Sequence, residues 1–325
     1  MVLAICLFGT FGYIFMYLAK QEKITTIDQI IMGEGKTILH RFFNGVSLFF
    51  LFGVTVIMLA GAGSLLNELL GIPYFVGSAC LTVLLAILSM KGMKGILVIS
   101  QTVVPILLVL VVIISLWSMV IFPAEEISGT LSQNGNPLLG NWFLATLSFF
   151  SYNILAALAV LTPAAQRTTD MKTIKKGIVQ GSIQLLLIFA CILISLQRFY
   201  GRIEGANFPM QALAGQLSPV LGTLYAVLLL SAMFSGALSC MFGATVQLFG
   251  EKEKKKSVIL MLWGIALVCS MAGFKELISV IFPVCGYAYL IAMPLTFRRF
   301  LTIRRKVGEA MNLSHNKYDD LVSTR

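Results

Sequence analysis

The stretch from Asn141 to Arg167 is apolar overall but carries a cluster of polar side chains in its middle. It is long enough to cross a bilayer as a helix, which takes about 20 apolar residues. Polar groups at that depth are tolerated where they face a bundle interior or a wet cavity, and interrupted apolar segments are common at transport sites. We therefore predict that a substrate is bound here by Ser148, Ser151, Tyr152 and Asn153. The alternative is that these groups bond back to their own helix, with the tyrosine at an interface.

Two glycines, Gly61 and Gly63, lie in the apolar sequence VIMLAGAGSLLNELLG. Glycines and alanines remove side-chain bulk and allow a neighbouring helix backbone to approach closely. We predict that the two glycines help to shape the substrate cavity. Tight helix packing by itself is the alternative.

Three serines, Ser231, Ser235 and Ser239, are spaced four residues apart and would share one face of a helix. Hydroxyl and carbonyl oxygens suit a hard cation such as sodium, whereas sulfur and imidazole do not. We predict a sodium ion at Ser235 and Ser239. The alternative is that each serine bonds to a carbonyl of its own helix.

Motifs of enzymes are missing from the sequence. The two histidines, His40 and His315, are not in an HExxH pattern, and no predicted strand precedes Gly61 as a dinucleotide fingerprint requires. The six cysteines all fall inside apolar runs without CxxC spacing and are interpreted as small hydrophobic residues. We expect neither an enzyme nor a cofactor, apart from the sodium ion.

The composition is that of a polytopic membrane protein. Hydrophobic residues make up 58% of the chain and charged residues 12%, and the mean hydropathy is +0.91. A soluble domain has roughly 45–50% apolar and 25% charged residues. The net charge of +10 comes from short basic clusters between apolar runs, so it indicates membrane topology and does not predict nucleic-acid binding.

Nine apolar segments are long enough to be predicted as membrane helices, which makes the expected fold an all-α transmembrane bundle. They are Val2–Ala19, Phe42–Leu66, Tyr74–Met90, Ile96–Phe122, Trp142–Ala165, Ile174–Gln197, Leu217–Phe249, Val258–Gly273 and Leu277–Phe297.

The basic residues predict the orientation of these helices. Of the 24 Lys and Arg residues, all except Arg198, Arg202 and Lys275 fall in alternate connections and in the C-terminal tail. By the positive-inside rule, that side faces the cytoplasm. The C-terminus is then cytoplasmic and, with nine crossings, the N-terminus is outside. This arrangement is typical of a ten-helix chain that lacks its first helix.

A weak internal repeat favours the same interpretation. Ile99-Ser100 and Pro105 match Ile278-Ser279 and Pro283 at nearly equal offsets, and the AGAGS and SGALS sequences of two long helices match at a similar one. Because an odd number of helices separates each pair, the repeats would be inverted. We predict that the transmembrane bundle occupies residues 1–300, with the remainder of the first repeat at 1–122, the second repeat at 141–300 and a cytoplasmic tail at 301–325.

The sequences VIMLAGAGSLLNELLGIPYFVG and GILVISQTVVPIL resemble those of the YkvI-like bacterial membrane proteins. That family is similar to the sodium/solute symporter and amino-acid transporter group with a five-plus-five inverted repeat. The resemblance implies a substrate helix broken at mid-membrane near Ser151, Tyr152 and Asn153, and a sodium site that includes hydroxyls of the helix bearing Ser235 and Ser239. The Gly-, Ala- and Ser-rich first helix of the YkvI-like proteins has no counterpart here.

These observations lead to the prediction of a secondary transporter in the inner (cytoplasmic) membrane. It would carry a small polar organic solute such as an amino acid, as a sodium- or proton-coupled symporter working by alternating access. Its expected partners are the solute and the lipid bilayer, and not nucleic acid. The alternative is a non-transporting or truncated membrane protein with a structural or regulatory role.

Overall fold

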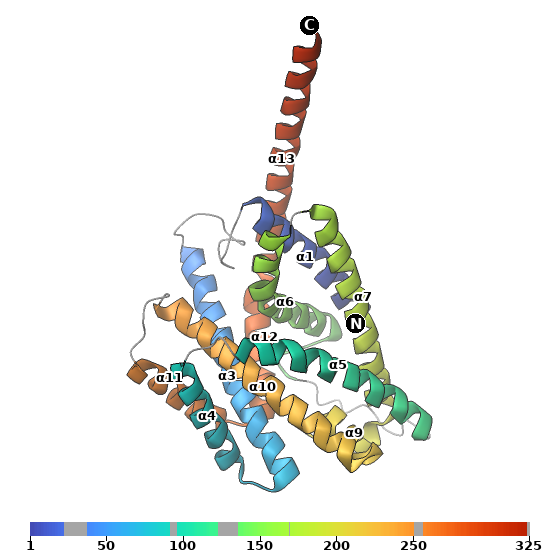
Figure 1. Cartoon of the computed structure of the whole chain (residues 1–325), viewed down its shortest axis with the longest axis vertical. Helices are drawn as coiled ribbons and strands as arrows, with labels where there is room; N and C mark the ends of the chain where they lie inside the picture. The colour runs from blue at the N-terminus through green and yellow to red at the C-terminus, as the bar shows by residue number, and fades with distance from the viewer. Residues whose placement is uncertain (23–37, 92–95, 123–135, 169, 250–255, 324–325) are drawn as a thin grey trace. The chain divides into compact units, whose positions relative to one another are not determined.

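The computed structural model describes residues 1–22, 38–91, 96–122, 136–168, 170–249 and 256–323. These residues form helices joined by short turns, and no strand occurs among them (Figure 1). The predicted all-α class is therefore confirmed for the part of the chain that is described.

The helices follow the predicted apolar segments closely. In chain order they are α1 (Val2–Gln21), α3 (Ile38–Leu70), α4 (Tyr74–Lys91), α5 (Ile96–Ile121), α6 (Trp142–Arg167), α7 (Met171–Arg198), α8 (Tyr200–Ile203), α9 (Pro209–Leu217), α10 (Pro219–Phe249), α11 (Lys256–Ser270), α12 (Phe274–Leu290) and α13 (Ala292–Ser323).

Six helical segments of the described chain are long and apolar enough to cross a membrane. They are Val2–Gln21, Ile38–Leu70, Thr102–Ile121, Met171–Arg198, Pro219–Phe249 and Phe274–Lys306. Three of the expected crossings are shorter apolar helices, at Tyr74–Met90, Trp142–Leu158 and Lys256–Ser270. The protein is therefore a multi-pass membrane protein by length and composition, and the count of nine crossings stays a prediction.

The predicted last helix, Leu277–Phe297, is wrong in its extent. Helix α12 ends at Leu290, and α13 begins at Ala292 and continues through the predicted tail as far as Ser323. The tail sequence contains no proline after Pro294, and Arg305 pairs with Glu309 one helical turn later. Such i,i+4 pairs stabilise a helix that leaves the apolar environment. Residues 301–323 are thus a helix (Figure 1).

The chain divides into two compact units. Unit 1 contains residues 1–46, 141–183 and 283–325, and unit 2 contains residues 47–140 and 184–282. The boundaries fall inside α3, α7 and α12. Each unit therefore takes segments from both of the predicted repeats.

In unit 1, α1 packs along α6 through large apolar side chains. The ring of Phe150 lies 5.3 Å from the rings of both Phe8 and Phe11, and Leu18 is fully buried in the same cluster. Helix α13 joins at Phe300, whose ring lies edge-on to Tyr17 at 5.2 Å. Aromatic contacts of this kind add to the energy of area burial, so α6 is held firmly against α1.

In unit 2, α3, α4, α10 and α11 share one buried apolar cluster. Leu59, Ala237 and Trp263 are almost fully buried in it, and the Trp263 indole nitrogen donates a hydrogen bond to Ser89 Oγ at 3.1 Å. A second cluster joins α5 and α10 to the short helices α8 and α9. Between α8 and α9 the chain turns at Gly205, whose φ of +83° lies in the region that favours glycine.

Candidate functional site

Helix α6 positions all four residues that the sequence predicts as the substrate site. Asn141 caps its N-terminus, because the Asn141 side-chain oxygen accepts a hydrogen bond from the Leu144 amide at 2.9 Å. The helix then continues without interruption to Arg167. The mid-membrane break implied by the family resemblance is therefore absent. No glycine or proline occurs between Trp142 and Thr162, so the sequence offers no residue that would interrupt the backbone bonds there.

Ser148 lies where α6 crosses α12. Its side chain is 1% exposed, and a Cβ atom added at Gly286 would overlap its hydroxyl and lie 2.8 Å from its carbonyl oxygen. The two helix backbones are therefore in direct contact at this point. Ser148 has a packing role here, and its hydroxyl has no hydrogen-bond partner among the described residues.

Ser151 lies one turn further along α6 and is fully buried. The Ser151 hydroxyl also has no hydrogen-bond partner in the described part of the chain. The same is true of the Thr162 hydroxyl. On the same helix, Thr146 donates in the ordinary way to the Trp142 carbonyl at 2.8 Å. An unpaired buried hydroxyl costs about 1–3 kcal/mol, so Ser151 and Thr162 are the groups on α6 that a bound molecule would most readily satisfy.

Asn153 and Tyr152 differ from these two. The Asn153 amide donates to the Phe149 carbonyl at 2.8 Å, so it bonds back to its own helix as the alternative interpretation expects. The Tyr152 ring packs edge-on against Phe149 at 5.7 Å. The predicted cluster therefore contains two fully buried serines and two partly buried side chains with partners on α6.

Gly61 and Gly63 lie in tightly packed parts of unit 2. An added Cβ at Gly63 would lie 2.8 Å from the Tyr74 carbonyl oxygen, and one at Gly77 would lie 3.2 Å from the Gly63 Cα atom. At Gly61 an added Cβ would come within 3.0 Å of the side chains of Met233 and Phe274. Close packing of α3 against its neighbours therefore explains both glycines, and their role in a substrate cavity stays a prediction.

The three serines of α10 all donate to carbonyl oxygens of their own helix. Ser231 donates to Val227 at 2.7 Å, Ser235 to Ala232 at 3.1 Å and Ser239 to Ser235 at 2.8 Å. These bonds use the hydroxyl hydrogens and leave oxygen lone pairs that can accept a cation. Among the described residues no cluster of three or more His, Cys, Asp or Glu side chains could hold a metal ion. A sodium ion would therefore rely on hydroxyl and backbone oxygens.

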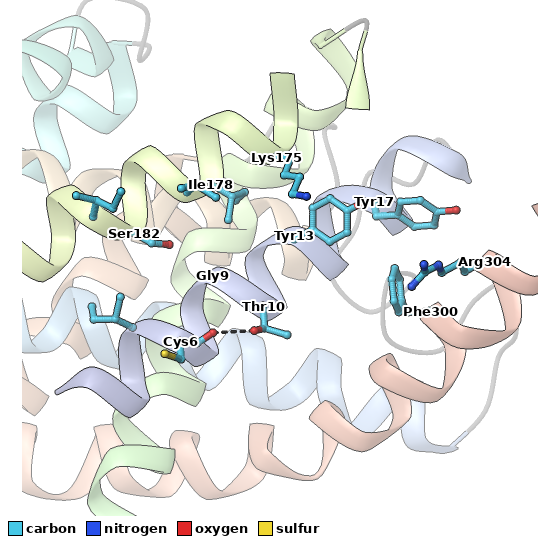
Figure 2. Close-up of a pocket in the computed structure, with 13 residues that line it drawn as sticks. Cys6, Gly9, Thr10, Tyr13, Tyr17, Lys175, Ile178, Ser182, Phe300 and Arg304 are labelled. Carbon is cyan, nitrogen blue, oxygen red and sulfur yellow. Dashed lines mark hydrogen bonds between the residues drawn. The ribbon is translucent and has the colours of Figure 1, made fainter. Parts of the chain in front are cut away.

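The structure also contains a groove in unit 1 that the sequence interpretation missed (Figure 2). Its volume is about 670 Å³, and its walls come from α1, α7 and α13. Along α7 the wall residues recur every three or four positions, which is one face of a helix. That spacing was visible in the sequence, but the matching faces of α1 and α13 could not be assigned to it without the fold. The wall residues are Ile5, Cys6, Gly9, Thr10, Tyr13, Tyr17, Lys175, Ile178, Val179, Ser182, Ile183, Phe300 and Arg304.

Helix α7 approaches α1 closely at Gly9, which lines the groove, and at Gly12. An added Cβ at Gly9 would lie 3.2 Å from Ser182 Oγ, and one at Gly12 would lie 3.2 Å from Ile178 Cδ1. The Thr10 hydroxyl donates to the Cys6 carbonyl at 2.8 Å and is therefore satisfied within its own helix. The groove is thus mostly apolar along its length.

The chain is similar to two bacterial proteins, one of which is named as a membrane protein. No protein-family model matches it. The uncharacterized membrane protein YkvI of Bacillus subtilis (strain 168) is 28% identical over 289 residues, which cover 87% of this chain and 81% of YkvI. The uncharacterized protein YyaD of the same organism is 22% identical over 252 residues, covering 76% of this chain and 71% of YyaD. These similarities support a YkvI-like membrane family and an integral membrane protein.

Proposed function

We propose that this chain is a secondary transporter of the cytoplasmic membrane for a small polar organic solute such as an amino acid. The observation that carries the proposal is the fully buried Ser151 hydroxyl on α6, which has no hydrogen-bond partner among the described residues. Buried polar groups are nearly always paired, and an exception requires an explanation. A polar solute bound against α6 would supply the partner.

The packing of α3 on α10 supports the inverted repeat that such a transporter needs. Thr55 contacts Ala237 and Gly61 contacts Met233, so the two helices run antiparallel along their contact. They are the helices that carry the matching AGAGS and SGALS sequences. Helices α4 and α11, which follow α3 and α10 in the chain, also run antiparallel and meet through Tyr74–Ser270 and Ser89–Trp263 hydrogen bonds. Contacts between inverted counterparts are what a pseudo-two-fold axis in the membrane plane would produce.

The division into two compact units supports alternating access as the mechanism. Transporters with inverted repeats work largely by rigid-body movement of one helical body against another. Among the described residues, each unit has buried apolar clusters of its own. The units could therefore keep their internal packing while they move.

Sodium is the coupling ion that we propose, bound by the oxygens of Ser235 and Ser239. Both hydroxyls donate within α10 and so present their lone pairs in a fixed direction. Oxygen ligands suit a hard cation. Proton coupling is the alternative, and an uptake assay with each gradient separates the two.

The test is uptake of labelled amino acids by the full chain in liposomes, driven by an inward sodium or proton gradient. If Ser151 bonds to the solute, Ser151→Ala reduces uptake by about tenfold or more, since such a bond is worth roughly 1.5–3 kcal/mol when a charged group takes part. Thr146→Ala is the matched control, because Thr146 is on the same helix and bonds only to it. Driven uptake that is equal in both variants would remove Ser151 from the site and leave transport intact.

A non-transporting role is the second candidate. It is favoured by the amide of Asn153 and the hydroxyls of Ser231 and Ser239, which all bond within their own helices, and by the close packing at Gly63. A protein of this kind would show no uptake driven by either gradient for any solute in the screen.

A further inference from the structure

The groove of unit 1 has a basic aromatic end and an apolar end. Lys175 and Arg304 lie at the first end with Tyr13, Tyr17 and Phe300, and Cys6 lies toward the other (Figure 2). The three rings form one group, with Phe300 5.2 Å from Tyr17 and 6.5 Å from Tyr13. This is the amphipathic pattern of a headgroup site followed by a chain site.

The positive charge at this end is not matched by the acidic residues described nearby. Arg299 pairs with Glu22, and Arg305 pairs with Glu309. Neither Lys175 nor Arg304 has an ion pair with an acidic residue of the described ranges. Two cations beside a group of aromatic rings are suited to an anionic headgroup.

The length of the groove fits one leaflet of a bilayer. From Tyr17 to Ile5 the wall follows α1 for three turns and a third, which is about 18 Å at 1.5 Å per residue. Half of a hydrocarbon core of about 30 Å is about 15 Å. An acyl chain that enters beside Tyr17 would therefore end near Ile5 and Cys6.

One wall of the groove, on α7, is exposed on the surface of the described chain. No residue in the most apolar 18-residue segment of α7 is buried. On the groove wall, the side chains of Val179 and Ile183 are about half exposed. If this apolar face of α7 meets the bilayer, as its composition predicts, a lipid can reach the wall without passing through the protein. We propose that the groove binds one anionic phospholipid, with its phosphate between Lys175 and Arg304 and an acyl chain along α1 and α7.

The test is native mass spectrometry of the full chain in mild detergent, titrated with phosphatidylglycerol and, separately, with phosphatidylcholine of the same acyl chains. We expect phosphatidylglycerol to bind about tenfold more tightly. Lys175→Gln with Arg304→Gln abolishes this preference. Lys176→Gln with Arg298→Gln is the matched control, because it removes the same charge from exposed positions on the same helices outside the groove, and it keeps the preference.

A second variant tests the acyl part. Val179→Trp fills the groove from a half-exposed position that tolerates a larger side chain, and it weakens binding of both phospholipids by at least tenfold. A phosphatidylglycerol with a photoreactive acyl chain should label the peptides around Cys6 and Ile183.

Three results would overturn the proposal. Equal affinity for the two phospholipids would exclude recognition of an anionic headgroup. Displacement of phosphatidylglycerol by equimolar inorganic phosphate would indicate a site for a free anion. A dimer whose formation is abolished by Val179→Trp would mean that a second copy of the chain covers the groove. Uptake is not used in the test, so failure of the transport proposal leaves this one standing.

Discussion

Gly286 of α12 touches the backbone of α6 at Ser148. A Cβ atom at Gly286 would lie 2.8 Å from the Ser148 carbonyl oxygen and 3.0 Å from the Ser148 Cα atom. Real Cβ atoms almost never come this close to a backbone atom, so only glycine permits the crossing. The position of α6, which carries the candidate substrate residues, thus depends on a residue of another helix that has no side chain.

The first prediction concerns this crossing. Gly286→Ala should destabilise the protein by about 1–3 kcal/mol, because the methyl group would force two helix backbones apart. Thermal unfolding of the detergent-solubilised protein measures the effect. Gly264→Ala on α11 is the control, since an added Cβ there meets nothing within 4 Å. Equal unfolding temperatures for the two variants would contradict the close crossing.

The Ser151→Ala substitution should have different effects on stability and on uptake. Ser151→Ala removes a buried hydroxyl that has no described partner, so the free energy of unfolding should stay the same or rise by about 1 kcal/mol. Uptake should fall in the same variant. The combination distinguishes a functional hydroxyl from a structural one, because loss of a structural bond would lower stability instead.

The serines of α10 allow a sodium prediction with an internal control. Ser235→Ala with Ser239→Ala should raise the sodium concentration for half-maximal uptake by about tenfold or more, as expected for disturbed ligands of a metal site. Ser231→Ala should leave it unchanged. Ser231 also donates within its helix, so a uniform change in all three serine variants would indicate a loss of helix packing.

The orientation of the chain is open to a direct measurement. A fluorescent protein fused after Arg325 should mature, because the basic clusters predict that this end is cytoplasmic. Alkaline phosphatase fused after Glu204 should be active, because this short connection would lie on the opposite side. The reverse pattern would invert the whole predicted topology.

Sequence patterns predicted the helices well where apolar residues were continuous. The segment Val2–Ala19 differs from α1 by two residues at its end, and Tyr74–Met90 differs from α4 by one. The errors occurred where two opposing signals met. The loss of apolar character after Phe297 suggested a tail, whereas local charge pairing continues α13 to Ser323. The chain also turns at Ile291, inside the predicted segment Leu277–Phe297.

For the candidate site, too, the sequence predicted some features and not others. Composition and the grouping of Ser148, Ser151, Tyr152 and Asn153 were enough to select α6 as the helix of interest. The pairing state of each side chain was not predictable, because a serine in a helix can donate to the preceding turn or face a neighbour, and local sequence does not distinguish the two. Only packing shows that Asn153 bonds within α6 while Ser151 does not.

The sequence by itself determined that this is an all-helical, multi-pass membrane protein, since the bilayer requires long apolar segments with internally satisfied backbones. The tertiary structure decided which faces meet. Gly9 and Gly12 bring α7 onto α1, and Phe300 of α13, nearly three hundred residues later in the chain, completes the groove beside Tyr17. Contacts between residues so far apart depend on the packing of whole helices, and no local pattern encodes them.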